Sequence, residues 1–508
     1  MSTTKKQTSS IDEFFHEKCF RFVKTSIQKL SYLQISVIVA ILCFLYILPI
    51  LLTNTYYVDD MNRISLGYNW DRDGRFISSQ LMHLLSFQKE VVYSGFPYNT
   101  LISSLLLAFT GFLLSHTIGM RHKTFLFLGS LLLLTCPFIL EILWYKFDSL
   151  PISCSLFCAV LPFIFFNSTW RFALATTLSV YFLFGFYQTS AFSYSIILCF
   201  FSIKHIWLSE YKKTIINGII GFFGFVLGFW WHAYKIKQLG MQIVDDQRAS
   251  FIFKDMNFTQ LLNERFNGFK ELLFALYTND YWIVIKVLII AILYSIICFC
   301  WRIDWRKERI LQILMTFCFV GIAILFSIGI NLFVYEYRWH PRSLIGYAFF
   351  TYIILFILYQ LPKKQYWIAI VATAPLIYYS FLISSQLGIF IKNQEELSDF
   401  VIDQIATETL KYNQLKLIID GEIQYAERNN TVHYETFPII YKLAPKYEKY
   451  FHYWGMVRLN KFGIFSDEYI HSNHRDQVLE DAKTFPVIQS NTIYELRIQE
   501  PYAVINFK

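Results

Sequence analysis

Runs of about twenty apolar residues recur between residues 33 and 389, and they restrict the fold more than any other feature of the sequence. A helix needs roughly 20 apolar residues to cross about 30 Å of hydrocarbon. Backbone polar groups in that layer must pair within the segment, so these runs predict helices. We therefore expect an all-α polytopic membrane protein with about eleven spans, near residues 33–53, 98–118, 124–143, 150–167, 172–188, 190–208, 215–232, 281–301, 310–333, 342–361 and 365–389.

The composition also favours a membrane protein. Hydrophobic residues make up 55% of the 508 residues and charged residues only 16%, whereas soluble domains carry about 25% charged residues. We attribute the net charge of +8 to membrane topology, because no basic stretch is interleaved with aromatic residues as a nucleic-acid surface requires. The expected partners therefore include the lipid bilayer and exclude nucleic acid.

The nine cysteines indicate neither a disulfide framework nor a metal site. Nearly all of them fall inside apolar runs, and no Cys-x-x-Cys pair occurs. Buried cysteine behaves as a small hydrophobic residue. The polar N-terminus lacks the apolar core and small-residue exit of a signal peptide, so we do not expect one.

Lysine and arginine in the short loops predict the orientation, because these residues collect on the cytoplasmic side. One side of the predicted topology carries most of them, namely Arg121, Lys123, Arg171, Lys204, Lys212, Lys213, Arg302, Arg306, Lys307, Arg309, Lys363 and Lys364. The short loops of the other side carry only Lys146, Arg338 and Arg342. The N-terminus is therefore expected in the cytoplasm, and an odd number of spans places the C-terminus in the periplasm.

The sequence divides into three predicted regions. Residues 1–32 form a cytoplasmic lead-in, either an amphipathic surface helix or a solvated segment. Residues 33–389 form the transmembrane domain, with outer loops at about 54–97 and 233–280, and residues 76–87 of the first loop have the spacing of a short helix in the headgroup layer. Residues 390–508 are more charged and contain the strand-like runs LKLIID and TIYELRI. They predict a small periplasmic α/β domain, which must be stabilised by its own core because it lacks cysteine.

The stretch VDDMNR directly follows the first predicted span and contains Asp59, Asp60 and Arg63. Carboxylates at a membrane boundary need water or a cationic partner. One interpretation is a local salt bridge that ends the first helix, since Arg63 lies within one helical turn of both acids. The other is a general base, because the opposed effects of a second acid and a nearby arginine suit proton abstraction.

A second polar stretch, GYNWDRDGR, covers residues 67–75. Asp71 and Asp73 match the Asp-x-Asp pattern that holds a metal and a nucleotide in some soluble glycosyltransferases. This copy is expected to face outward, where nucleotide sugars are absent. We therefore favour a solvated turn in which Gly74 relaxes the backbone and Arg75 is available for a phosphate, to which arginine offers paired hydrogen bonds.

Three further polar clusters are predicted at outer helix ends. They are WYKFDSLP with Lys146 and Asp148, FYQTSAFSYS with Tyr187 and Gln188, and NLFVYEYRWHPRSL with Arg338 and Arg342. Each cluster alone is typical of an interfacial belt. Together with VDDMNR they predict an outward cavity, lined by acids and arginines, that suits a lipid phosphate and a sugar.

Taken in order, YYVDDMNRISLGYNWDRDGR, WYKFDSLPISCSL, LFGFYQTSAFSYS and HPRSL resemble the bacterial serotype-converting O-antigen glucosyltransferases. The resemblance covers roughly residues 50–350. It implies a GT-C type fold in the bacterial inner membrane. The implied donor is undecaprenyl-phosphate glucose, and the implied acceptor is a sugar hydroxyl of O-antigen.

The resemblance also implies roles for individual residues. Asp59 would serve as the base, with Asp60 as its orienter or substitute. Candidates for the donor phosphate are Arg63, Arg75, Lys146, Arg338 and Arg342, and candidates for sugar contacts are Tyr187, Gln188 and Asp148. No cofactor or dedicated metal ligand set is expected, although magnesium held by Asp59 and Asp60 stays an alternative.

Two other functions deserve comparison with glucosyl transfer. A transporter or flippase of lipid-linked saccharide would place charges near the bilayer midplane, in paired broken helices of two similar halves. Here the charges lie at outer helix ends and the halves do not mirror each other. A sensor or scaffold would use the C-terminal domain to bind glycan. Glucosyl transfer is the interpretation that accounts for the acidic pair.

Overall fold

The structure is a computed structural model that describes residues 28–241, 252, 257–277, 282–300, 307–332, 339–412, 414–429, 436–449, 453–465 and 472–508. The chain forms two compact units. The first comprises Met1–Leu48 and Asn69–Ser384, and the second comprises Pro49–Tyr68 and Ser385–Lys508. Most of the predicted lead-in over residues 1–32 lies outside the described residues.

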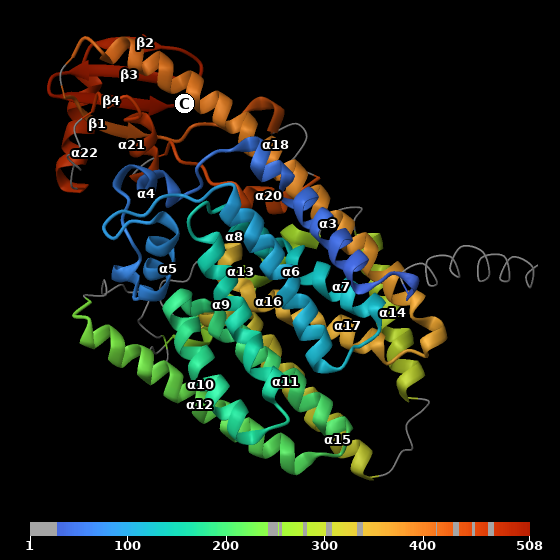
Figure 1. The fold of residues 1–508 in the computed structure, drawn as a ribbon. Helices are drawn as coiled ribbons and strands as arrows, with labels where there is room; N and C mark the ends of the chain where they lie inside the picture. The colour runs from blue at the N-terminus through green and yellow to red at the C-terminus, as the bar shows by residue number, and fades with distance from the viewer. Residues whose placement is uncertain are drawn as a thin grey trace, which may run out of the picture. The chain divides into compact units, whose positions relative to one another are not determined.

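The first unit is built from helices (Figure 1). Over its described residues, each predicted span coincides with one helix or with two or three consecutive helices. Two helices, α3 (Tyr32–Thr53) and α18 (Trp367–Thr409), contain residues of both units. The others are α5 (Phe76–Ser86), α6 (Tyr98–Ile118), α7 (Lys123–Leu134), α8 (Pro137–Trp144), α9 (Ser149–Val160), α10 (Thr169–Phe186), α11 (Ala191–Trp207), α12 (Tyr211–Gln238), α13 (Phe258–Tyr277), α14 (Trp282–Cys300), α15 (Lys307–Ile328), α16 (Ile345–Phe350) and α17 (Tyr352–Tyr359).

Short 3-10 helices connect several of these segments. They are η2 (Asp71–Asp73), η3 (Leu161–Phe165), η4 (Gln188–Ser190), η7 (Gly329–Leu332), η8 (Pro341–Leu344) and η9 (Lys363–Gln365). The predicted short helix near residues 76–87 is confirmed as α5. The predicted outer loop 233–280 is not a plain loop, because α12 extends to Gln238 and α13 occupies Phe258–Tyr277.

Seven helices of the described chain are long and apolar enough to cross a membrane, or up to eight if one bent pair is a single span. The chain is therefore a polytopic membrane protein. Two shorter apolar segments, Ser149–Phe165 and Ile285–Cys300, coincide with further predicted spans. The expectation of eleven spans stays a prediction.

The predicted span 124–143 is divided into α7 and α8, which are bent by 57°. Pro137 occupies the first turn of α8. Proline lacks a backbone N–H and cannot continue a preceding helix, so α7 ends just before it. The short α8 then leads into Tyr145–Asp148, one of the predicted polar clusters.

Helices α10 and α12 lie side by side through glycines of α12 (Figure 1). A Cβ atom added to Gly224 would lie 2.9 Å from Thr176 Cγ2, and one added to Gly228 would lie 2.6 Å from the Thr177 carbonyl oxygen. In a membrane the hydrophobic effect does not drive helices together, so their association depends on close packing. Small residues allow two helices to approach closely enough for this. This contact fixes α12 beside the end of α10, from which Tyr187 and Gln188 follow.

The second unit contains a four-stranded mixed sheet of strand order β1-β4-β3-β2, visible as successive arrows in Figure 1. The strands are β1 (Lys416–Asp420), β2 (Val487–Ser490), β3 (Tyr494–Gln499) and β4 (Tyr502–Phe507). Strand β1 pairs parallel to β4, and the other neighbours pair antiparallel. The unit also contains α4 (Asp60–Leu66), α20 (Pro438–Leu443), α21 (Tyr453–Leu459), α22 (Ser472–Asp481) and η10 (Ala482–Thr484).

Alternating residues of the sheet face two small cores. Leu417 and Ile419 of β1 pack with Val401 and Ile405 of α18 on one face. Ile418, between them, packs with residues of α22 and η10 on the other face. This period of two is what a strand buried on both faces requires.

The predicted strand-like runs are confirmed as β1 and β3, and the C-terminal region does contain a small sheet. One feature of the unit is absent from the sequence prediction. Pro49–Tyr68, which includes VDDMNR, belongs to the same compact unit as the C-terminal sheet.

Candidate functional site

The acidic pair lies on a turn and short helix of the second unit. Val58 has a φ of 49°, which is unusual for a β-branched residue. Asp59 is the N-cap of α4, and Asp60 is its first residue. The Asp60 N–H donates to the Tyr57 carbonyl over 3.1 Å, and the Arg63 N–H donates to the Asp59 carbonyl over 3.1 Å. A strained backbone followed by two acids is a feature found at functional sites.

The C-terminal region holds this turn at two points. The Val58 N–H donates to the hydroxyl of Tyr447 over 2.9 Å. The hydroxyl of Tyr57 donates to the Leu443 carbonyl. Helix α21 also packs against α4. Residues almost four hundred positions later in the chain therefore maintain the conformation of VDDMNR, as the φ value of Val58 requires.

The two acids differ in exposure. Asp60 is fully buried, at 0% exposure, whereas Asp59 is only half-buried. Arg63 is also buried, and its guanidinium lies 4.7 Å from the ring centre of Tyr68. Only an accessible carboxylate can take a proton from an incoming substrate, so Asp59 is the better placed of the two.

A charged network surrounds Tyr447. Arg458 Nη2 lies 2.9 Å from a Glu395 carboxylate oxygen, and its Nε lies 3.2 Å from Glu448 Oε1. Its guanidinium is 5.4 Å from the Tyr447 ring centre. Burial lowers the pKa of Arg458, but the carboxylates of Glu448 and Glu395 outweigh it and raise the pKa. Burial raises the pKa of Tyr447, so its hydroxyl stays protonated and neutral.

A second set of predicted residues meets around Arg75 in the first unit. Arg75 follows η2 and Gly74, whose φ of 72° lets the chain turn before α5 begins. Arg75 Nε donates to Gln188 Oε1 over 3.1 Å, and Nη1 lies 3.5 Å from Asp148 Oδ1. The guanidinium lies 4.6 Å from the ring centre of Tyr187.

We call Arg75, Asp148, Tyr187 and Gln188 the Arg75 cluster. Further hydrogen bonds hold its side chains in place. Asp148 Oδ1 also accepts a 2.7 Å hydrogen bond from Trp70 Nε1, and Gln188 Nε2 donates to the Asp73 carbonyl over 2.7 Å. The Arg75 side chain remains 22% exposed. Within the described chain its contacts use Nε and Nη1, so the Nη2 donors are available to an anion.

The Asp71–Asp73 segment is confirmed as a turn, with Arg72 and Asp73 exposed. Sequence reasoning missed the buried His232 of α12, which supports this turn. Its Nε2–H donates to the Gly74 carbonyl over 3.0 Å, and its ring stacks on Phe76. His232 lies within a predicted span, and a polar residue in an apolar run is itself a sign of a structural or functional role. This sign could have identified it from the sequence.

Two further predicted cations have aromatic neighbours. Lys146 is buried, with its ammonium 4.4 Å from the Phe96 ring centre. The guanidinium of Arg342 lies 4.5 Å from the ring centre of Tyr145. Such contacts attract a cation to the face of an aromatic ring.

Arg342 also meets Glu141, a buried acid that sequence reasoning missed. The Arg342 backbone N–H donates to Glu141 Oε2 over 2.6 Å, and Arg342 Nε lies 4.0 Å from Oε1. Glu141 lies inside the predicted span 124–143, and a lone acid in such a run was a usable signal. Arg338, the last predicted phosphate contact, lies outside the described residues.

The structure thus brings together Arg75, Asp148, Tyr187 and Gln188, for which the sequence predicted separate phosphate and sugar contacts. Asp148 and Gln188 hold the arginine directly. Asp59, Asp60 and Arg63 belong to the other compact unit. Among the residues that the structure describes, no group of three or more histidine, cysteine or carboxylate side chains could hold a metal ion.

Comparison with known proteins gives a family. The model of the family described as Glucosyl transferase GtrII matches residues 48–359, which is well over half of the chain. No curated protein and no solved structure matches. The matched range contains every site residue that the sequence predicted, and it confirms the resemblance to O-antigen glucosyltransferases. The chain therefore belongs to the glucosyl transferase GtrII family and is a glycosyltransferase of the membrane.

Proposed function

We propose that the protein transfers glucose from undecaprenyl-phosphate glucose to a sugar hydroxyl of O-antigen, at the periplasmic face of the bacterial inner membrane. Membership of the glucosyl transferase GtrII family supports the transfer of glucose. The observation that carries the rest is the acidic turn, in which an accessible Asp59 stands beside a fully buried Asp60. The expected orientation, with the N-terminus in the cytoplasm and the C-terminus in the periplasm, belongs to the same proposal.

In the proposed mechanism Asp59 acts as a general base. It takes the proton of the acceptor hydroxyl while that oxygen attacks the anomeric carbon of the donor. The bond between the anomeric carbon and the phosphate oxygen breaks, and its electron pair leaves with undecaprenyl phosphate. Backside attack inverts the anomeric configuration. A positioned base of this kind typically contributes about 10²–10⁴-fold to the rate.

Arg75 is proposed to stabilise the charge that grows on the departing phosphate. A preorganised cation is most effective where charge develops in the transition state, and the Nη2 donors of this partly exposed side chain suit a phosphate oxygen. Asp148 and Gln188 orient it through the contacts described above, a role that these contacts favour over direct sugar binding. Tyr187 stays a proposed sugar contact.

Arg63, Lys146, Arg338 and Arg342 remain further proposed phosphate contacts. Of these, Lys146 and Arg342 lie over aromatic rings. No cofactor is part of the mechanism, and magnesium at Asp59 and Asp60 stays the alternative to a purely cationic stabilisation.

The proposal predicts two products that mass spectrometry can identify. Purified protein given undecaprenyl-phosphate glucose and O-antigen should yield glucosylated O-antigen and free undecaprenyl phosphate, both measured by mass spectrometry. A flippase would instead move the donor across vesicle membranes and leave both reactants unchanged. Movement without any transfer would reject the proposal.

Replacing Tyr447 by phenylalanine is expected to lower kcat about tenfold while leaving the KM for donor unchanged. The variant removes the acceptor for the partly buried Val58 N–H, and the loss of one hydrogen bond costs about 0.5–1.5 kcal/mol. The turn that presents Asp59 then loses part of its order, although donor binding does not depend on it. Steady-state kinetics on the purified variant measure both constants.

The matched control is Tyr425→Phe. Tyr425 lies in the same unit, and its ring packs edge-on against Phe390 and Tyr441. The phenylalanine keeps these ring contacts, so transfer should proceed at the normal rate. An equal loss in both variants would show that Tyr447 acts through general stability and not through the turn.

A further inference from the structure

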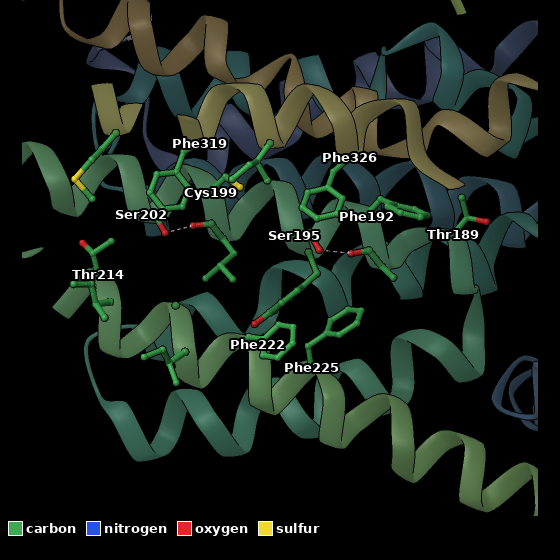
Figure 2. Close-up of a pocket in the computed structure, with 18 of the residues that line it drawn as sticks. Thr189, Phe192, Ser195, Cys199, Ser202, Thr214, Phe222, Phe225, Phe319 and Phe326 are labelled. Atoms are coloured by element: carbon green, nitrogen blue, oxygen red, sulfur yellow. Dashed lines mark hydrogen bonds between the residues drawn. The ribbon is translucent and has the colours of Figure 1, made fainter. Parts of the chain in front are cut away.

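An apolar groove runs between helices α11, α12 and α15 of the first unit (Figure 2). Its volume is about 750 Å³, and phenylalanine rings supply much of its wall, including Phe192, Phe222, Phe225, Phe319 and Phe326. The hydroxyls of Ser195 and Ser202 donate to the carbonyls of Ala191 and Leu198 in their own helix. The O–H donors of both serines are therefore already used, and the phenylalanine rings leave the middle of the groove suited to hydrocarbon.

One end of the groove is polar. Gln188 and Thr189 line it there, and Gln188 Oε1 is the acceptor of the hydrogen bond from Arg75 Nε. From Gln188 to Ser202, which also lines the groove, the chain rises roughly 21 Å at about 1.5 Å per residue. The groove therefore begins at the Arg75 cluster and follows α11 through most of the thickness of a hydrocarbon layer.

We propose that this groove binds the polyprenyl chain of the donor while the donor phosphate lies at Arg75. The inference rests on the proposed function and adds the site of the lipid chain to it. The protein offers one cation, Arg75, at the start of one apolar groove. This arrangement matches a polyprenyl phosphate, which carries one chain for each phosphate. A membrane phospholipid carries two chains on its phosphate, and the experiment below treats it as the competing occupant.

Gly218 offers a way to fill the groove without disturbing the fold. It lines the groove, and a Cβ atom added to it would meet no heavy atom within 4 Å. A leucine at this position would thus extend into open space. Gly321 of α15 has the same open surroundings but is not among the residues that line the groove, so Gly321→Leu is the matched control.

The experiment compares two donors that differ only in chain length, undecaprenyl-phosphate glucose and a glucosyl phosphate of a two-isoprene alcohol. Gly218→Leu is expected to raise the KM for the long donor at least tenfold, the effect of losing contact with a few methylene groups. Its KM for the short donor and both kcat values should stay as in the unmodified protein. Gly321→Leu should change none of these constants.

A normal KM for the long donor in Gly218→Leu would overturn the inference, as would an equal rise for both donors. If the unmodified protein transfers glucose from neither donor, the proposed function fails. The groove is then tested by native mass spectrometry with undecaprenyl phosphate, which Gly218→Leu should bind more weakly than Gly321→Leu. Loss of co-purified phospholipid with normal undecaprenyl phosphate binding would assign the groove to phospholipid and reject the proposal.

Discussion

Replacing Asp59 by asparagine is expected to slow glucosyl transfer by about 10²–10⁴-fold, with the protein still folded. Asparagine has nearly the same shape as aspartate but cannot accept the proton of the acceptor hydroxyl. It is also as good a helix N-cap as aspartate, so α4 should begin normally. The loss should appear in kcat, measured with saturating donor and acceptor, while the KM for donor changes little.

Two comparisons make this result specific. Asp73→Asn removes a carboxylate that follows Asp59 by fourteen residues in the sequence and is exposed on η2, and it should transfer glucose normally. Asp60→Asn replaces a fully buried acid, so we expect a lower melting temperature together with a smaller loss of kcat than in Asp59→Asn. Normal transfer by Asp59→Asn would place the base elsewhere. A larger loss of kcat in Asp60→Asn, with its melting temperature unchanged, would exchange the roles of the two acids.

The transmembrane helices could be predicted because each one is a local property of the sequence. A run of apolar residues must satisfy its backbone within itself, whatever surrounds it. Helix ends were harder to place. The division at Pro137 and the extension of α12 to Gln238 depend on single residues and on close packing through glycines, which the average character of a run does not reveal.

The candidate site was predictable only in part. Asp148 and Gln188 stood out because each follows an apolar run, and Arg75 stood out at the end of the polar stretch GYNWDRDGR. Nothing local shows that residues 73 and 113 positions away would hold the arginine. Tyr447 and Arg458 carry no signal in the sequence, since they lie in a part of the C-terminal region where charged, aromatic and aliphatic residues are mixed without a clear period. Tyr447 matters through its contact with a turn almost four hundred residues earlier, and Arg458 through its contact with Tyr447.

Replacing Arg75 by alanine is expected to reduce kcat/KM by about 10²–10³-fold, the usual loss when one group that stabilises developing charge is removed. The same change should weaken inhibition by the product undecaprenyl phosphate, because the phosphate loses its partner in the ground state as well. Arg75→Lys keeps the charge but lacks the planar fork of donors, so it should recover only part of the rate. Arg72→Ala, which removes the exposed arginine of η2, is the matched control and should behave normally.

The loss in Arg75→Ala could also arise because Asp148 stays buried without its cation, since removing one partner of a buried pair is destabilising. Adding Asp148→Asn removes that charge, and an amide oxygen can still accept the hydrogen bond from Trp70 Nε1. The double variant should therefore regain the melting temperature of the unmodified protein without regaining its rate. If the double variant transfers glucose at nearly the normal rate, Arg75 serves only to neutralise Asp148, and the donor phosphate is held by other cations.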